Sequence, residues 1–239
     1  MRAAEVCVTQ QGCPERATDL RNAIELVQPV DRPEPAGEVY LFWQRAAEGP
    51  VSVKALRRAL PEIDADQIAT WLDGYDPCGA GQVAPVTWAA AVMHTVFVER
   101  PLESASDLIL ADAALSLALV WRRVLPLLAL GLKRADLRKA GEDLRLACHR
   151  AISAAAAEVT REAADHVRRI ARLTEVAPKL RAKGSDEAVA MFLTQDAVAP
   201  TSLTALRSDR AARRFCDRLV ALGTVRELTG RDTFRLYGI

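Results

Sequence analysis

Residues 200–223 read PTSLTALRSDRAARRFCDRLVALG, and they decide the expected fold of the C-terminal end. Apolar side chains recur in this stretch every three or four residues, which is the spacing of one helical stripe. The apolar stripe consists of Ala212, Phe215, Cys216, Leu219 and Leu222. The opposite stripe consists of Arg210, Arg213, Arg214, Asp217 and Arg218. The pattern predicts a helix with one buried face and one strongly basic face.

The ends of this basic helix are signalled by their residue types. Ser208 is the expected N-cap, because its hydroxyl can accept a hydrogen bond from the first helical turn. Gly223 is the expected left-handed end of the helix. Two further helices are expected before it: one over 186–194 capped by Ser185, and a short one that Thr201 or Ser202 caps and that ends at Leu206.

The residues after the basic helix predict a β-hairpin. Residues 224–228 and 233–237 are rich in β-prone side chains, and Thr-Gly-Arg-Asp separates them. Helix, short helix, turn, basic helix and hairpin follow one another in the order of a winged helix-turn-helix. The apolar stripe would hold the basic helix to the other two helices, while its opposite face would enter the major groove of DNA.

Charge supports a DNA-binding reading of this segment. Between Pro200 and Ile239, eight arginines oppose four carboxylates, although the whole chain has a net charge of only +1. Arginine binds guanine edges bidentately, so Arg210, Arg213 and Arg214 are the expected base contacts. The arginines of the hairpin are better placed to contact DNA phosphates. Such contacts position a protein on the duplex without reading the DNA sequence. The candidate DNA-binding residues are Ser208, Arg210, Arg213, Arg214, Arg218, Arg226, Arg231 and Arg235.

The rest of the chain predicts a mainly α protein. Half of the 239 residues are apolar but only 5% are aromatic, which favours helices packed through small and aliphatic side chains. Helical periodicity runs unbroken over 141–176, and it predicts one long central helix in a multi-helix bundle. We expect an all-helical domain over 1–182 and a winged helix-turn-helix domain over 183–239. A homodimer through the helical domain is expected as a partner. For the 141–176 helix, a long coiled-coil dimer is the less favoured alternative to a place at the centre of a bundle.

Enzymatic chemistry is not expected. The two histidines of the long helix, His149 and His166, are seventeen residues apart and do not have a zinc-binding spacing. The Gly79-Ala-Gly81 turn lacks the Lys and Ser or Thr of a phosphate loop. No nucleophile–base set is recognisable, so we predict no catalytic residue, no metal ligand, no cofactor and no enzyme activity.

Cysteine usage and hydropathy bear on the compartment. Five scattered cysteines do not form a disulfide framework, which is typical of a reduced, cytoplasmic setting. No apolar run reaches the roughly 18 residues of a membrane span, so no membrane partner is expected.

A second basic cluster lies at Lys133, Arg134, Arg138 and Lys139, opposed by Asp136. A solvated face is favoured there over a phosphate contact.

Three C-terminal segments resemble a known bacterial family. These segments are APKLRAKG (177–184), SDRAARR (208–214) and VRELTGRDTFRLYG (225–238). They are similar to the domain-of-unknown-function family numbered 1403, and weaker similarity runs back through LADAAL (110–115) to about residue 20. The resemblance implies no activity, because that family has none established. It implies that this copy is short at its start, since members typically carry more helical sequence there.

The same end also resembles the winged helix that closes many Fic-type AMP-transferases. The shared pattern is LGxVRExTGR, where x is any residue, and residues 222–231 read LGTVRELTGR. The His-Pro-Phe and Gly-Asn-Gly-Arg elements of the transferase itself are absent, so the resemblance implies only the shared module. We therefore predict a DNA-binding protein, either a regulator or a plasmid-maintenance accessory. The alternative is a helical scaffold whose winged helix binds protein.

Overall fold

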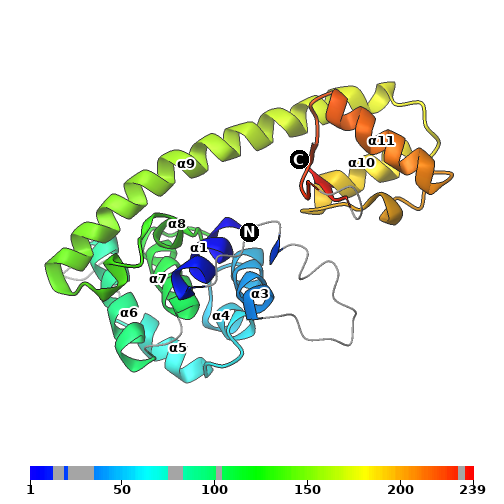
Figure 1. Cartoon of the computed structure of the whole chain (residues 1–239). Helices are drawn as coiled ribbons and strands as arrows, with labels where there is room; N and C mark the ends of the chain where they lie inside the picture. The colour runs from blue at the N-terminus through cyan, green and yellow to red at the C-terminus, as the bar shows by residue number, and fades with distance from the viewer. Residues whose placement is uncertain (13–18, 21–34, 75–82, 101–103, 231–234) are drawn as a thin grey trace. The chain divides into compact units, whose positions relative to one another are not determined.

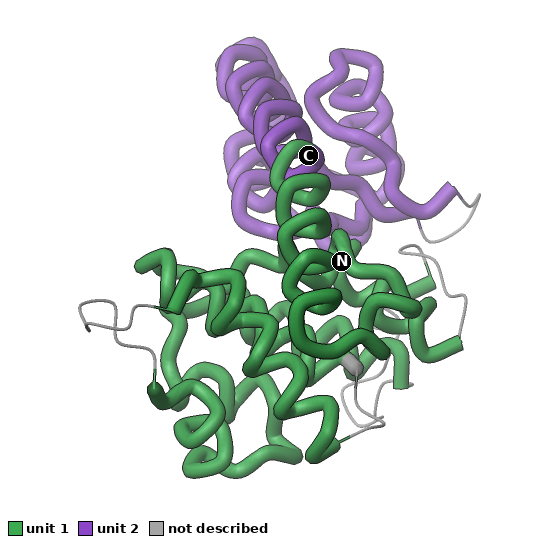
Figure 2. Tube along the Cα trace, turned by 90° about the vertical axis from the view of Figure 1, so that its left-hand side faces the viewer, with its two compact units in different colours: residues 1–157 green, residues 158–239 purple. Residues whose placement is uncertain are grey.

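The structure is a computed structural model that describes residues 1–12, 19–20, 35–74, 83–100, 104–230 and 235–239 (Figure 1). It is mainly α, with one long helix and a two-stranded sheet near the C-terminus, which confirms the predicted fold class. The chain forms two compact units, Met1–Ala157 and Glu158–Ile239 (Figure 2). The division therefore lies inside the long helix, 25 residues before the expected boundary at 182/183.

The first unit is built of helices. Their bounds are α1 (Arg2–Gln11), α3 (Pro35–Glu48), α4 (Val53–Ala59), α5 (Ala65–Leu72), α6 (Pro85–Glu99), α7 (Ser104–Ala118), α8 (Leu127–Gly131), the 3-10 turn η1 (Asp136–Arg138) and the first part of α9 (Gly141–Val176). The long helix α9 has the bounds that its periodicity predicts. None of the described helices is long and apolar enough to cross a membrane.

Helix α7 is the buried helix of this unit. Every residue from Ala105 to Ser116 is buried, as its apolar residues on all sides predict. The apolar spacing over 104–124 predicts a helix that continues to Val124, but α7 ends at Ala118. Val120 adopts a left-handed φ of 55°, and Trp121 N donates to Ser116 O at 2.8 Å. Val120 N also donates to Leu117 O at 3.0 Å, so the two bonds satisfy carbonyls of the last helical turn, and the left-handed residue turns the chain away from the helix.

Asp112 has a different role from the one expected. From the sequence, a carboxylate at Asp112 is expected near the start of the helix, where it would favour the positive end of the helix dipole. In the structure Asp112 is fully buried in the middle of α7. There it accepts hydrogen bonds from Leu128 N at 2.8 Å and Ala129 N at 3.1 Å. Asp112 thus satisfies the first free N–H groups of α8, a partner far away in sequence. Burial raises the pKa of Asp112 to about 8, against the lowering effect of these backbone donors.

We predict that Asp112 makes the stability of the first unit fall as pH rises. Its pKa is higher in the folded than in the unfolded chain, so the folded state binds the extra proton between about pH 4 and pH 8. Within that window, the free energy of unfolding of wild type should fall by up to about 1.4 kcal/mol per pH unit relative to that of Asp112→Asn, whose side chain cannot titrate. Because all four tryptophans lie in this unit, unfolding followed by tryptophan fluorescence measures the difference. A pH-independent difference would contradict the prediction.

The second unit begins in the C-terminal part of α9. It continues through the 3-10 turn η2 (Ala177–Lys179), α10 (Ser185–Thr194), the 3-10 turn η3 (Pro200–Ser202), α11 (Asp209–Ala221), β1 (Arg226–Glu227) and β2 (Tyr237–Gly238). Leu173 of α9 and Leu180 after η2 are buried in one core with Phe192, Phe215 and Tyr237. The end of the long helix therefore belongs to this unit, which explains the earlier division of the chain.

The second helix of the predicted helix-turn-helix is not an α-helix. Residues 200–202 form a single 3-10 turn, and Leu206 N then bonds to Leu203 O at 3.0 Å in another tight turn. Ser202 Oγ donates to Ala199 O at 2.7 Å, so this side chain supports the turn rather than a longer helix. So short a segment also cannot recover the cost of nucleating a helix.

The cap of α10 also differs from the prediction. Gly184, with a φ of 86°, is the N-cap residue. Ser185 is buried within the first turn, and its Oγ donates to Leu180 O at 3.1 Å. This bond ties the beginning of α10 to the segment that follows α9.

Candidate nucleic-acid interface

Helix α11 begins as the sequence predicts. Ser208 is its N-cap, and Ser208 Oγ accepts a hydrogen bond from Ala211 N at 3.3 Å. Ser208 therefore has a structural role at the beginning of the basic helix. Its exposed position leaves the same residue at the surface beside Arg210.

The two faces of α11 are separated as expected. Ala212, Phe215, Cys216 and Leu219 are buried in the core of the second unit, and Leu222 is partly buried. Burial raises the pKa of the Cys216 thiol to about 12, so it is an inert core residue rather than a nucleophile. The apolar face fixes the helix, and its basic face is left at the surface.

The arginines of α11 all lie on the exposed face. They are Arg210, Arg213, Arg214 and Arg218. None of the four has a carboxylate within ion-pair distance among the residues that the structure describes. Asp217, the carboxylate of this face, instead accepts a long hydrogen bond of 3.5 Å from Tyr237 Oη. In the described part of the chain, the arginines of the basic face thus form no ion pair with a carboxylate.

The end of α11 is closed by a Schellman motif at Gly223. Gly223 has a φ of 67°, its N–H bonds to Val220 O at 2.8 Å, and Thr224 N bonds to Leu219 O at 3.1 Å. Thr224 Oγ1 donates to the same carbonyl of Leu219 at 3.0 Å. The predicted left-handed end is confirmed, and it directs the chain into the hairpin.

The hairpin strands are shorter than predicted. β1 and β2 pair antiparallel, with Arg226 opposite Gly238 and Glu227 opposite Tyr237. Arg226 is exposed, whereas Arg235 is partly covered and lies 3.8 Å from Glu227. Arg231 and Asp232 of the expected tip lie outside the described residues. Of the hairpin arginines that the structure describes, Arg226 is therefore the better candidate for a phosphate contact.

One pairing in this unit was missed by sequence analysis. Val198 N donates to Tyr237 O at 2.8 Å, and Tyr237 N donates to Val198 O at 3.0 Å. The bridge attaches β2, the second strand of the hairpin, to the segment between α10 and η3. A single bridging residue has no periodicity, so no local pattern could reveal it.

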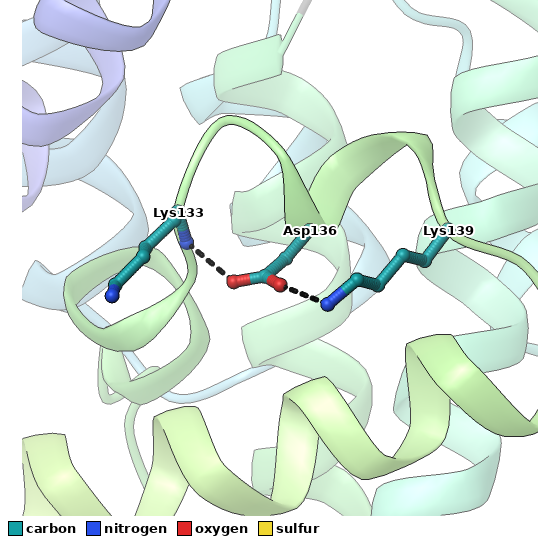
Figure 3. Close-up of polar contacts among 3 residues, drawn as sticks. All are labelled: Lys133, Asp136 and Lys139. Carbon is teal, nitrogen blue, oxygen red and sulfur yellow. Dashed lines mark hydrogen bonds and ion pairs between the residues drawn. The ribbon is translucent and has the colours of Figure 1, made fainter.

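The second basic cluster is engaged in a local turn. Asp136 accepts from Lys133 N at 3.0 Å and from Lys139 Nζ at 2.5 Å (Figure 3). The bond from Lys139 holds the pKa of Asp136 below its usual value. Since one of the lysines is already paired, this cluster is a weaker candidate for an anion than the face of α11. No group of three or more metal-ligating side chains gathers in the described ranges.

We predict that Ser208→Ala destabilises the second unit by about 1 kcal/mol. The substitution removes the acceptor of the Ala211 N–H and leaves that donor without its cap. Ser208→Asp, which restores an acceptor at the same position, should recover most of the loss. Denaturant unfolding followed by circular dichroism measures both changes. Equal stabilities for the alanine variant and wild type would show that the cap is not formed.

Comparison with known proteins gives one match. A family model described as "Protein of unknown function (DUF1403)" matches residues 1–239. No curated protein and no solved structure matches the chain. The family resemblance seen in the C-terminal segments is confirmed over the full length, while the likeness to the winged helix of Fic-type proteins stays a prediction.

Proposed function

We propose that this chain, which belongs to the DUF1403 family, binds double-stranded DNA through the basic face of α11, with the hairpin as a winged-helix contact. The observation that carries the proposal is the set of four exposed arginines on one face of a helix whose other face is buried. Such a helix can enter a major groove without losing the packing that holds it.

The distribution of charge supports the same assignment. Residues 158–239 hold fifteen Lys and Arg against eleven Asp and Glu, whereas residues 1–157 hold seventeen against twenty. A nearly neutral chain thus has its positive charge in the unit that contains α11. Local positive charge of this kind attracts the phosphate backbone, and arginine side chains can also bind base edges. A regulatory or plasmid-maintenance role would follow from binding of this kind.

A mobility-shift assay with the full chain and a labelled duplex tests the proposal. We expect a shift at low salt that weakens steeply as salt is added. The alternative function is a helical scaffold whose C-terminal unit binds protein. Recovery of one stoichiometric protein partner together with no shift at low salt would select that alternative and reject DNA binding.

A further inference from the structure

The middle of α9 has an apolar stripe at its surface. Val159, Ala163, Val167 and Ile170 follow one another at spacings of four, four and three residues. At 3.6 residues per turn they lie within an arc of about 80°. Val167 is 65% exposed, Ile170 is 41% exposed, and Ala163 is exposed as well. Single exposed apolar side chains are ordinary, but a stripe along one helix indicates an interaction surface.

The spacing of this stripe is self-complementary. When a second α9 lies antiparallel with the two-fold axis near Asp165, Val159 meets Ile170 of the partner subunit. Ala163 then meets Val167 of the partner subunit, so that a small side chain faces a larger one. A two-fold axis repeats each contact, because the same patch serves both copies. The stripe therefore fits its own reversed copy along its whole length.

Charge also favours the antiparallel arrangement. Glu162 and Arg169 flank the stripe on the same side, about 100° and 120° around the helix from Ala163. In an antiparallel pair, Glu162 faces Arg169 of the partner subunit, and the two-fold axis makes a second such pair. Residues 158–165 hold three carboxylates and one arginine, whereas residues 167–173 hold three arginines and no carboxylate. A parallel pair would place like charges together, which is unfavourable.

We propose that this chain forms a two-fold antiparallel dimer through residues 159–170 of α9, with a second copy of the chain as the occupant of the stripe. Flanking ion pairs of this kind set the partner and orientation of packed helices, while the apolar stripe provides the contact. The inference is independent of the proposed DNA binding, since it concerns another surface and is tested by the mass of the free protein.

Light scattering and sedimentation of the full chain test the dimer. Wild type should be dimeric at micromolar concentration. Val167→Glu places two charges in the interface and should weaken self-association at least about 100-fold. The matched control is Val98→Glu on α6, which has the same chemistry at a residue that is 62% exposed, and it should leave the dimer intact. A monomeric wild type, or equal effects of the two variants, would overturn the proposal.

A charge exchange tests the direction of the helices. Glu162→Arg alone and Arg169→Glu alone should each weaken the dimer, because each places like charges opposite one another. The double variant should restore it, since the pair is rebuilt with its signs reversed. Circular dichroism of each variant verifies that α9 stays folded. A double variant as weak as the single ones would reject the antiparallel arrangement even if the chain is dimeric.

Discussion

Replacement of Arg213 and Arg214 together by alanine is expected to weaken binding to duplex DNA by about 100-fold at low salt. Both side chains lie on the exposed face of α11 without a carboxylate partner among the described residues. Each arginine that contacts a base or phosphate contributes about 1–3 kcal/mol, and the pair together gives the expected loss. The measurement is fluorescence anisotropy of a labelled duplex titrated with the full chain.

The fold should survive this double substitution. Exposed side chains away from caps and cores change stability by about 0.5 kcal/mol or less, so the unfolding transition should not move. The matched control is Arg134→Ala with Arg138→Ala, which removes two exposed arginines from the second basic cluster. That control should bind DNA nearly as wild type does. Equal losses in the two double variants would mean that α11 is not the DNA-binding surface.

Gly184→Ala is expected to destabilise the second unit by about 3 kcal/mol or more. Gly184 has a φ of 86°, and a Cβ there would lie 2.2 Å from Ala205 O. Since the colliding atom belongs to the backbone, it cannot move aside as a flexible side chain would. The substitution therefore forces α10 and the 203–206 turns apart, and it adds the cost of a left-handed alanine.

A second glycine separates the two contributions. Gly223 also has a positive φ, but a Cβ there would meet only the end of Arg172 at 3.5 Å, which is ordinary contact. Gly223→Ala should therefore lower the free energy of unfolding only by the cost of holding an alanine in a left-handed conformation, about 1 kcal/mol. Circular dichroism follows both units, while tryptophan fluorescence follows the first unit alone. Similar losses for the two variants would show that Ala205 does not pack against Gly184 as described.

Elements with long periodic patterns were predictable from the sequence. The bounds of α9, the buried stripe of α11 and the all-round burial of α7 follow from side chains that repeat at helical spacing. Caps at Ser208 and Gly223 were also predictable, because a cap depends on residues within one turn. The same local signals gave the order of elements in the C-terminal unit.

Features that depend on distant partners were not predictable. Asp112 caps α8 rather than its own helix, and Val198 pairs with Tyr237 across the C-terminal unit. The domain boundary depends on Leu173, which packs with α10 and α11 although nothing in its own segment marks a break. Each of these contacts joins residues far apart in the chain, where local propensity carries no information.

The dependence of DNA affinity on salt tests the central claim most directly. If the four exposed arginines of α11 and Arg226 contact phosphates, the logarithm of the binding constant should fall linearly with the logarithm of the salt concentration. The slope should be no steeper than about −4.5. Arg213→Ala with Arg214→Ala should reduce that slope by up to about 1.8. Absence of binding at low salt, or an affinity and slope that the double substitution leaves unchanged, would contradict DNA binding through α11.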